Sequence, residues 1–232
     1  MRAMSTTSSG ISWDERYAGD AYGFGTEPND FLRECMALPA MAAAPLRALC
    51  IGDGEGRNGV WLAGLGHDVT TVDLSPVGVA KALRLAAERG VRVDARAADL
   101  AAWDLGTDAW DLVVSVFCHM VPALRADVHA RIARAVRPGG WYLLEAYRPD
   151  NVGRGVGGPQ SPELNVTLDE LRGQFAGWEL VVAREVEREI HEGRYHDGLS
   201  ATTQLLARRP GPADAASARG AHGAVERGAA RS

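Results

Sequence analysis

The sequence has few cysteines, no long apolar run and no excess of positive charge. Its three cysteines, Cys35, Cys50 and Cys118, are too few and too scattered for a disulfide framework or a zinc cluster. No apolar run reaches the roughly 18 residues of a membrane-spanning helix, and residues 1–10 lack the apolar core of a secretory signal. We therefore expect a cytoplasmic protein without a membrane partner. The net charge of -5 argues against a nucleic-acid partner, which favours a basic face.

What remains is the composition of an ordinary globular domain. Hydrophobic residues make up 46% and charged residues 24% of 232 positions, enough for one self-sufficient core. We divide the chain into an N-terminal cap or lid segment (1–45), a main domain (46–209) and a tail (210–232). The tail consists mainly of alanine, glycine, proline and arginine without an apolar period, which predicts disorder.

Three glycines on alternate positions, Gly52, Gly54 and Gly56, follow a short apolar strand at 48–51, and a helix is predicted after them. Strand, glycine loop and helix are typical of the first half of a doubly wound nucleotide-binding fold, with the ligand at the carboxyl end of the strand. A pyrophosphate-binding loop has the spacing G-x-G-x-x-G. Here the third glycine comes one residue early and Arg57 occupies the position of the dinucleotide glycine. The spacing therefore favours S-adenosylmethionine, which has no pyrophosphate, over a nicotinamide dinucleotide.

The rest of the chain alternates predicted strands and helices. After a helix at 30–38 that Pro39 ends, strands are expected at 68–72, 91–98, 110–117 and 141–147, and helices at 76–89 and 124–136, the last stopped by Arg137-Pro138-Gly139-Gly140. A short helix at 167–175 precedes two strands, 178–190 and 200–207, whose brief link permits an antiparallel hairpin. This order predicts an α/β fold, a Rossmann-like doubly wound sheet of seven strands, mostly parallel with an antiparallel last strand.

Two segments have no regular period. Residues 11–38 contain Trp13, Tyr17, Tyr22 and Phe24 among glycines, which indicates either a cap over the sheet edge or a lid that closes over the ligand and excludes water. Residues 151–162 are rich in glycine and proline, so we expect either a mobile loop or an ordered part of a substrate pocket.

Three motifs, Gly54-Glu55-Gly56-Arg57-Asn58, Trp13…Arg16-Tyr17 and Arg137-Pro138-Gly139-Gly140, resemble class I S-adenosylmethionine-dependent methyltransferases. Within that class they are similar to the tellurite-resistance branch, close to thiol and thiopurine methyltransferases. The resemblance covers residues 11–208 and implies S-adenosyl-L-methionine as the cofactor, but it does not specify the acceptor. One departure is Cys50, which stands where the family usually has an acidic residue, and Asp53 is the candidate to take over part of its role.

The resemblance implies cofactor contacts at the carboxyl ends of the strands. Asp73 would accept hydrogen bonds from both ribose hydroxyls, Asp99 would accept from the adenine amino group, and Arg57 would hold the cofactor carboxylate. The alternatives are a solvated strand end for Asp73, a helix cap for Asp99 and a helix-surface position for Arg57. The complete cofactor set is Tyr17, Tyr22, Gly52, Asp53, Gly54, Gly56, Arg57, Asn58, Asp73, Leu74, Ser75, Asp99, Leu100, Phe117 and Cys118.

Four side chains are candidates for catalysis: His119, His191, Arg194 and His196. His119 follows the strand at 110–117, and the other three lie in the link between the last two strands. A thiol with a pKa of about 8.5 is mostly protonated at neutral pH, so a histidine is suited to assist it. The alternatives are a helix cap or backbone partner for His119 and surface polarity for the link residues. No close pair has metal-ligand spacing, so we expect no metal.

The leading hypothesis is an S-adenosylmethionine-dependent methyltransferase that acts on a small soft nucleophile, in detoxification or in tailoring of a metabolite. A thiol, a selenol or a metalloid oxyanion such as tellurite would qualify. The alternatives are O- or N-methylation of a specialised metabolite and a cofactor-binding module without catalysis. We expect a small-molecule acceptor as the partner, and the sequence does not specify the oligomeric state.

Overall fold

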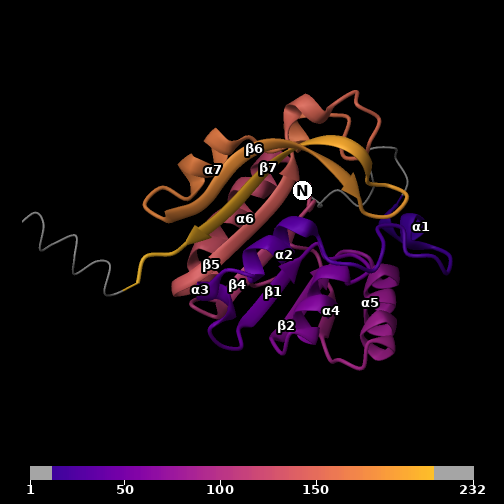
Figure 1. Cartoon of the computed structure of the whole chain (residues 1–232), viewed down its shortest axis with the longest axis horizontal. Helices are drawn as coiled ribbons and strands as arrows, with labels where there is room; N and C mark the ends of the chain where they lie inside the picture. Colours follow the sequence, from indigo (N-terminus) through magenta and orange to yellow (C-terminus); the bar gives the residue numbers. More distant parts are fainter. Residues whose placement is uncertain (1–11, 212–232) are drawn as a thin grey trace, which may run out of the picture.

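The computed structural model describes residues 12–211, which contain one seven-stranded sheet with helices on both faces (Figure 1). The strands are β1 (Arg47–Ile51), β2 (Asp68–Asp73), β3 (Asp94–Ala97), β4 (Trp110–Val116), β5 (Val136–Tyr147), β6 (Glu179–His191) and β7 (Asp197–Arg208). The helices are α1 (Trp13–Tyr17), α2 (Asp30–Met36), α3 (Pro39–Ala42), α4 (Arg57–Gly64), α5 (Pro76–Glu88), α6 (Pro122–Ala135) and α7 (Leu168–Gln174), with 3-10 turns at Pro149–Asn151 and Pro162–Leu164.

The strand order, β3-β2-β1-β4-β5-β7-β6, confirms the predicted doubly wound fold. β1 pairs in parallel with both β2 and β4, so the direction of winding reverses beside it. β7 runs antiparallel to both β5 and β6. In open sheets of this kind a ligand binds at the carboxyl ends of the strands where the winding reverses. The topology therefore places a binding crevice after β1.

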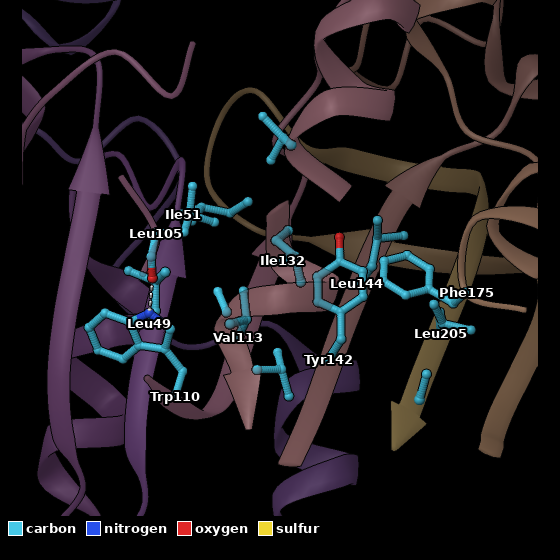
Figure 2. Packing of buried hydrophobic residues seen from close by; sticks show 14 of the residues in the cluster. Leu49, Ile51, Leu105, Trp110, Val113, Ile132, Tyr142, Leu144, Phe175 and Leu205 are labelled. Carbon is cyan, nitrogen blue, oxygen red and sulfur yellow. Dashed lines mark hydrogen bonds between the residues drawn. The ribbon is translucent and has the colours of Figure 1, made fainter. Parts of the chain in front are cut away.

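Alternate residues of β1 face the two helical layers, as the period of a strand buried on both sides requires. Leu49 and Ile51 belong to a core beneath α6 and α7, together with Tyr142 of β5 and Phe175 at the end of α7 (Figure 2). The intervening residues of β1 belong to a second core, with α2, α3 and Leu62 of α4. Two apolar layers thus fix the sheet whose strand ends carry the loops.

Several predicted boundaries differ from the structure by a few residues. The helix predicted to end at Pro39 is α2, which ends at Met36. Pro39 itself begins α3, because a proline is favoured at the first helical position. The segment 137–140 was predicted to break the chain between helix and strand. Instead β5 begins at Val136, which pairs with Trp110, and the Gly139 amide donates to the Arg209 carbonyl at 2.9 Å. The link between β6 and β7 is shorter than predicted, 192–196 instead of 191–199.

The long β6–β7 hairpin reaches from the sheet toward α1 (Figure 1). This brings residues 192–196 against the N-terminal segment, where a Cβ on Gly23 would meet the Tyr195 ring at 2.8 Å. Most of the predicted tail, residues 212–232, lies outside the described residues. No helix within residues 12–211 is both long and apolar enough to cross a membrane.

Candidate active site

A cavity of about 250 Å³ lies at the carboxyl ends of β1, β2 and β4. Its floor is formed by the glycine loop and by the residues that follow β2, β3 and β4. The rest of its lining comes mainly from three parts distant in the sequence: the N-terminal segment, the loop at 157–159 and the tip of the β6–β7 hairpin. The fold therefore supplies one half of the site, and peripheral segments supply the other.

The glycine loop passes between two side chains at close range. Gly52 and Gly54 have φ of +60° and +55°, a region that favours glycine. A Cβ on Gly54 would lie 2.5 Å from Oη of Tyr17, and a Cβ on Gly52 would lie 2.5 Å from Sγ of Cys118. Side chains at either position would therefore displace the cavity wall.

Asp73, the last residue of β2, is 8% exposed and held by two backbone amides. Its Oδ2 accepts from Gly54 N and its Oδ1 from Ser75 N, both at 2.8 Å. Each carboxylate oxygen has a further lone pair to offer a ligand. Burial raises the pKa of Asp73 to about 6. The carboxylate is thus oriented before any ligand arrives, while Ser75 lies outside the cavity and caps α5 by accepting from Gly78 N.

Asp53 lines the cavity but turns one oxygen into the fold. Its Oδ2 accepts from Gly59 N at 3.0 Å, in the first turn of α4, and burial raises its pKa to about 7. Cys50 is buried within the sheet. Asp99 also lines the cavity, and its Oδ1 accepts from Ala101 N at 2.8 Å within a turn. No helix lies in the described segment between β3 and β4, so the helix-cap alternative for Asp99 is wrong.

A buried ion pair fastens the N-terminal segment to the glycine loop. Lys81 of α5 lies 2.5 Å from Oε1 of Glu55, and both side chains are at most 7% exposed. Oε2 of Glu55 accepts from Gly23 N at 2.7 Å, and Lys81 Nζ donates to the Ala21 carbonyl at 2.6 Å. Sequence reasoning missed this pair, although Lys81 on the apolar face of a predicted helix was a signal. Tyr22 lies outside the cavity, and the centroid of its ring is 5.1 Å from Nζ of Lys81.

A cluster of aromatic rings forms another part of the site. Phe117, just after β4, has φ of +51°, a strained conformation of the kind often found at functional sites. Its ring lies 4.6 Å from both Tyr147 and His196, measured between ring centroids, and Phe24 lies 4.7 Å from His196. These rings thus bring together the segment 23–25, the ends of β4 and β5, and the hairpin.

His119 lines the same cavity, and only one of its ring nitrogens has a hydrogen-bond partner among the described residues. Its Nδ1 lies 3.2 Å from the Leu164 carbonyl, and since a carbonyl only accepts, Nδ1 carries the proton. Nε2 is then a bare acceptor, and it is buried with no hydrogen-bond partner among the described residues. Burial lowers the pKa of His119 to about 3, so the ring is neutral near pH 7.

The three predicted link residues separate in the structure. His196 lines the cavity, whereas His191 and Arg194 do not. His191 is exposed and its Nδ1 lies 2.6 Å from Asp197 Oδ1. The Arg194 guanidinium lies over the Tyr195 ring at 4.5 Å. The alternative of a polar surface position therefore describes His191 and Arg194. In contrast, His196 is buried, and this burial lowers its pKa.

The cavity collects most of the predicted cofactor residues. Those that line it are Tyr17, Gly52, Asp53, Gly54, Arg57, Asn58, Asp73, Leu74, Asp99, Leu100, Phe117 and Cys118, whereas Tyr22, Gly56 and Ser75 lie outside. Lining residues that the prediction omitted include Trp13, Arg16, Phe24, Glu55, Leu164 and Tyr195. In the described part of the chain, no group of three or more histidine, cysteine or acidic side chains is arranged to hold a metal ion.

The model of a family described as a methyltransferase domain matches residues 48–140, from β1 into β5. Hemagglutinin 1 of Eikenella corrodens is 33% identical over 177 residues, which are 72% of this chain and 56% of that protein. The chain thus spans little more than half the length of this relative.

Solved structures share the fold. One, from a study of the conversion of a disulfide bond into a thioacetal group during echinomycin biosynthesis, is 21% identical, with a TM-score of 0.66 over 90% of this chain and 93% of that one. TehB from Haemophilus influenzae is 18% identical, with a TM-score of 0.64 over 86% and 68% of the two chains.

A third structure is more similar in sequence. It is the 1,6-didemethyltoxoflavin-N1-methyltransferase of Burkholderia thailandensis with bound 1,6-didemethyltoxoflavin and S-adenosylhomocysteine, 26% identical, with a TM-score of 0.56 over 78% of each chain. The family match is thus confined to the part of the chain that carries the glycine loop and the ends of β1 to β4, and the solved structures share the fold of the described residues.

Proposed function

We propose that this protein transfers a methyl group from S-adenosylmethionine to a small soft nucleophile: a thiol, a selenol or a metalloid oxyanion such as tellurite. The observation that carries the proposal is that one cavity is lined both by Asp73 with the glycine loop and by His119, whose Nε2 is a buried acceptor without a partner among the described residues. One end offers the contacts that a nucleoside needs, and the other offers an apolar, aromatic pocket with one acceptor.

The residues at the first end fit the cofactor. Asp73 has free lone pairs for two ribose hydroxyls, and the close approach of Tyr17 and Cys118 to the loop requires glycine at positions 52 and 54. Leu74, Asp99 and Leu100 would border the adenine. When bound, S-adenosylmethionine supplies an electrophilic methyl group: the bond from acceptor to methyl carbon forms as the sulfonium C–S bond breaks, and the cofactor leaves as a thioether.

The second end favours an acceptor that loses its proton easily. Burial keeps both His119 and His196 neutral and weakly basic. Nε2 of His119 is therefore suited to accept a hydrogen bond from the acceptor and to orient it, rather than to deprotonate a weak acid. Alignment and exclusion of water are the main requirements of such a displacement. Thiols, with a pKa of about 8.5, meet this condition far better than alcohols.

A second candidate is N-methylation of a flat heterocycle. The relative of 26% identity is an N1-methyltransferase with its heterocyclic acceptor bound. The rings of Phe24, Phe117 and His196 would equally suit a planar molecule.

Incubation of the purified protein with methyl-labelled S-adenosylmethionine and a panel of acceptors tests the proposal. The panel contains aliphatic and aromatic thiols, a selenol, tellurite, nitrogen heterocycles and alcohols. We expect label on sulfur, selenium or tellurium, located by mass spectrometry of the product. Transfer only to ring nitrogen would establish the second candidate, and binding of cofactor without transfer to any acceptor would indicate a non-catalytic module.

A further inference from the structure

One buried arginine joins two loops that contribute to the cavity lining. Arg125, in the first turn of α6, is 4% exposed. Its Nη1 donates to the Met120 carbonyl at 3.0 Å and to the Glu163 carbonyl at 3.2 Å. Met120 lies in the loop after β4, and Glu163 lies in the 3-10 turn at Pro162–Leu164. The guanidinium therefore fastens together two segments that are far apart in the sequence.

His119 joins the same two segments. Its Nδ1 donates to the Leu164 carbonyl at 3.2 Å. Met120 is the neighbour of His119 in the chain, and Glu163 is the neighbour of Leu164, so the two carbonyls that Arg125 binds flank this hydrogen bond. In a neutral imidazole, the partner of one ring nitrogen decides which nitrogen carries the proton. The guanidinium thus keeps the His119 ring beside the partner that sets its tautomer.

Glu170 of α7 holds the guanidinium from the other side. Its Oε1 accepts from Nε of Arg125 at 2.8 Å and its Oε2 accepts from Nη2 at 2.9 Å, a bidentate pair of fixed geometry. Nε2 of Gln174 also donates to Oε1 of Glu170, at 3.0 Å. Neither Arg125 nor Glu170 lines the cavity. Both can therefore act on a bound molecule only through the residues that they hold.

The charge of Arg125 also favours a neutral His119 ring. Burial is the main cause of the low pKa of His119, and the neighbouring His196 and the guanidinium of Arg125 lower that pKa further by repulsion. The hydrogen bond to Leu164 acts in the opposite direction. A ring that stays neutral keeps one nitrogen without a proton, which is the state that the proposed function requires.

We propose that Arg125, held by Glu170, is the positioning residue that keeps the proton of His119 on Nδ1 and so leaves Nε2 as a hydrogen-bond acceptor for the molecule to be methylated. The proposal rests on the proposed function, because that function gives Nε2 its task. A merely structural arginine would stabilise the packing of α6 on α7 without any influence on the tautomer of His119.

Nitrogen-15 NMR of the full chain distinguishes these two roles. A ring nitrogen with a proton and one without resonate far apart, and the spectrum of His119→Phe identifies which signals belong to His119. In the unmodified protein we expect a single tautomer with the proton on Nδ1. In Arg125→Met we expect a mixture of both tautomers, because the two loops are no longer fastened together. This readout needs no substrate and no turnover.

Arg131→Met is the matched control. Arg131 lies on the same helix, and its guanidinium likewise donates to two backbone carbonyls, those of Trp103 and Leu100. It has no contact with the loops that Arg125 joins, so its removal should leave His119 as a single tautomer. Arg125→Lys keeps a positively charged donor near the carbonyls and should retain the single tautomer in most molecules.

A double variant controls for folding. Arg125→Met leaves the carboxylate of Glu170 without its cation, whereas Arg125→Met/Glu170→Gln leaves no charge unpaired. Thermal melting shows which variants fold, and the double variant replaces Arg125→Met in the NMR comparison if the single variant does not fold.

Turnover with an identified methyl acceptor gives a second readout. Arg125→Met should lower kcat/KM about fivefold, as expected for the loss of one neutral hydrogen bond, and should leave the affinity for S-adenosylhomocysteine unchanged. Adding His119→Phe to Arg125→Met should cause no further loss, because both substitutions act through the same nitrogen.

Three results would overturn the proposal: a single Nδ1-protonated tautomer in the folded Arg125 variants, a mixture in Arg131→Met as well, or losses in kcat/KM that multiply when Arg125→Met and His119→Phe are combined. If no acceptor were methylated by the unmodified protein, the proposed function would fail. The tautomer of His119 in Arg125→Met would still show whether Arg125 orients the ring.

Discussion

The two halves of the cavity are built differently. The half that we propose to bind the cofactor, the cofactor half, uses residues at the ends of adjacent parallel strands. The backbone amides of Gly54 and Ser75 hold Asp73 there. The half that we propose to bind the acceptor, the acceptor half, joins the N-terminal segment, the 157–159 loop and the hairpin. The ring of Phe24 packs on His196 of the hairpin, and the buried pair of Lys81 and Glu55 ties the N-terminal segment to the glycine loop. The first half is fixed by the sheet, whereas the second depends on how peripheral segments dock. Substitutions should therefore separate binding of cofactor from assembly of the acceptor pocket.

The largest effect is expected where the two halves are fastened together. Lys81→Met removes the cation beside the buried Glu55 and should lower the free energy of unfolding by about 3–5 kcal/mol, the usual cost of leaving one partner of a buried pair. Urea denaturation measures this. The double variant Lys81→Met/Glu55→Gln should lose less, because no charge is left unpaired. A loss below about 1 kcal/mol in Lys81→Met would show that the N-terminal segment is held by other contacts.

Asp73→Ala tests the cofactor half by itself. It should weaken binding of S-adenosylhomocysteine by about 1.5–3 kcal/mol, the scale of hydrogen bonds to a charged group, as measured by calorimetry. Asp99→Ala is the matched control at the next strand end, and its effect should be smaller because Asp99 is more exposed. Equal affinity in Asp73→Ala and the unmodified protein would remove Asp73 from the site.

Cofactor affinity should also depend on pH. Since burial raises the pKa of Asp73 to about 6, its carboxylate becomes protonated as the pH falls through that value and then loses acceptors for the ribose. Affinity should therefore drop by up to about tenfold per pH unit below 6 and level off above it. Asp73→Asn should show a weaker dependence in calorimetric titrations between pH 5 and about 8. A dependence that is identical in Asp73→Asn would assign the titration to another group, such as Asp53.

The smallest effect is expected in the acceptor half. His119→Phe keeps a ring against Tyr147 but removes Nε2, so kcat/KM should fall about fivefold, which corresponds to a neutral hydrogen bond of ~1 kcal/mol. Affinity for S-adenosylhomocysteine should not change, which distinguishes the two halves. An equal loss of cofactor affinity would show that His119 supports the glycine loop instead.

The difference between the cofactor half and the acceptor half also explains which features the sequence could predict. The doubly wound sheet, the glycine loop and Asp73 were predictable because each follows from consecutive residues: buried strands that alternate with helices, a turn that needs glycine and an acidic strand end. These local signals place residues together through the known geometry of parallel sheets. The positions of Leu74, Asp99 and Phe117 at the cavity followed from the same rule.

The composition of the acceptor half could not be predicted in the same way. The contact between Asn29 and Glu192 joins residues 163 positions apart, and no local pattern specifies it. Which of His191, Arg194 and His196 enters the cavity depends on the hairpin register and on where its tip docks, and only His196 does so. Lys81 was visible as a charge on an apolar helix face, but its partner Glu55 was hidden within the glycine motif.

The central claim is that the crevice after β1 binds a sulfonium nucleoside rather than a dinucleotide. Calorimetric titration of the protein with S-adenosylhomocysteine and, separately, with NAD⁺ tests it most directly. We predict saturable binding of S-adenosylhomocysteine at one site per chain and no binding of NAD⁺. Binding of NAD⁺ in preference to S-adenosylhomocysteine would contradict the account.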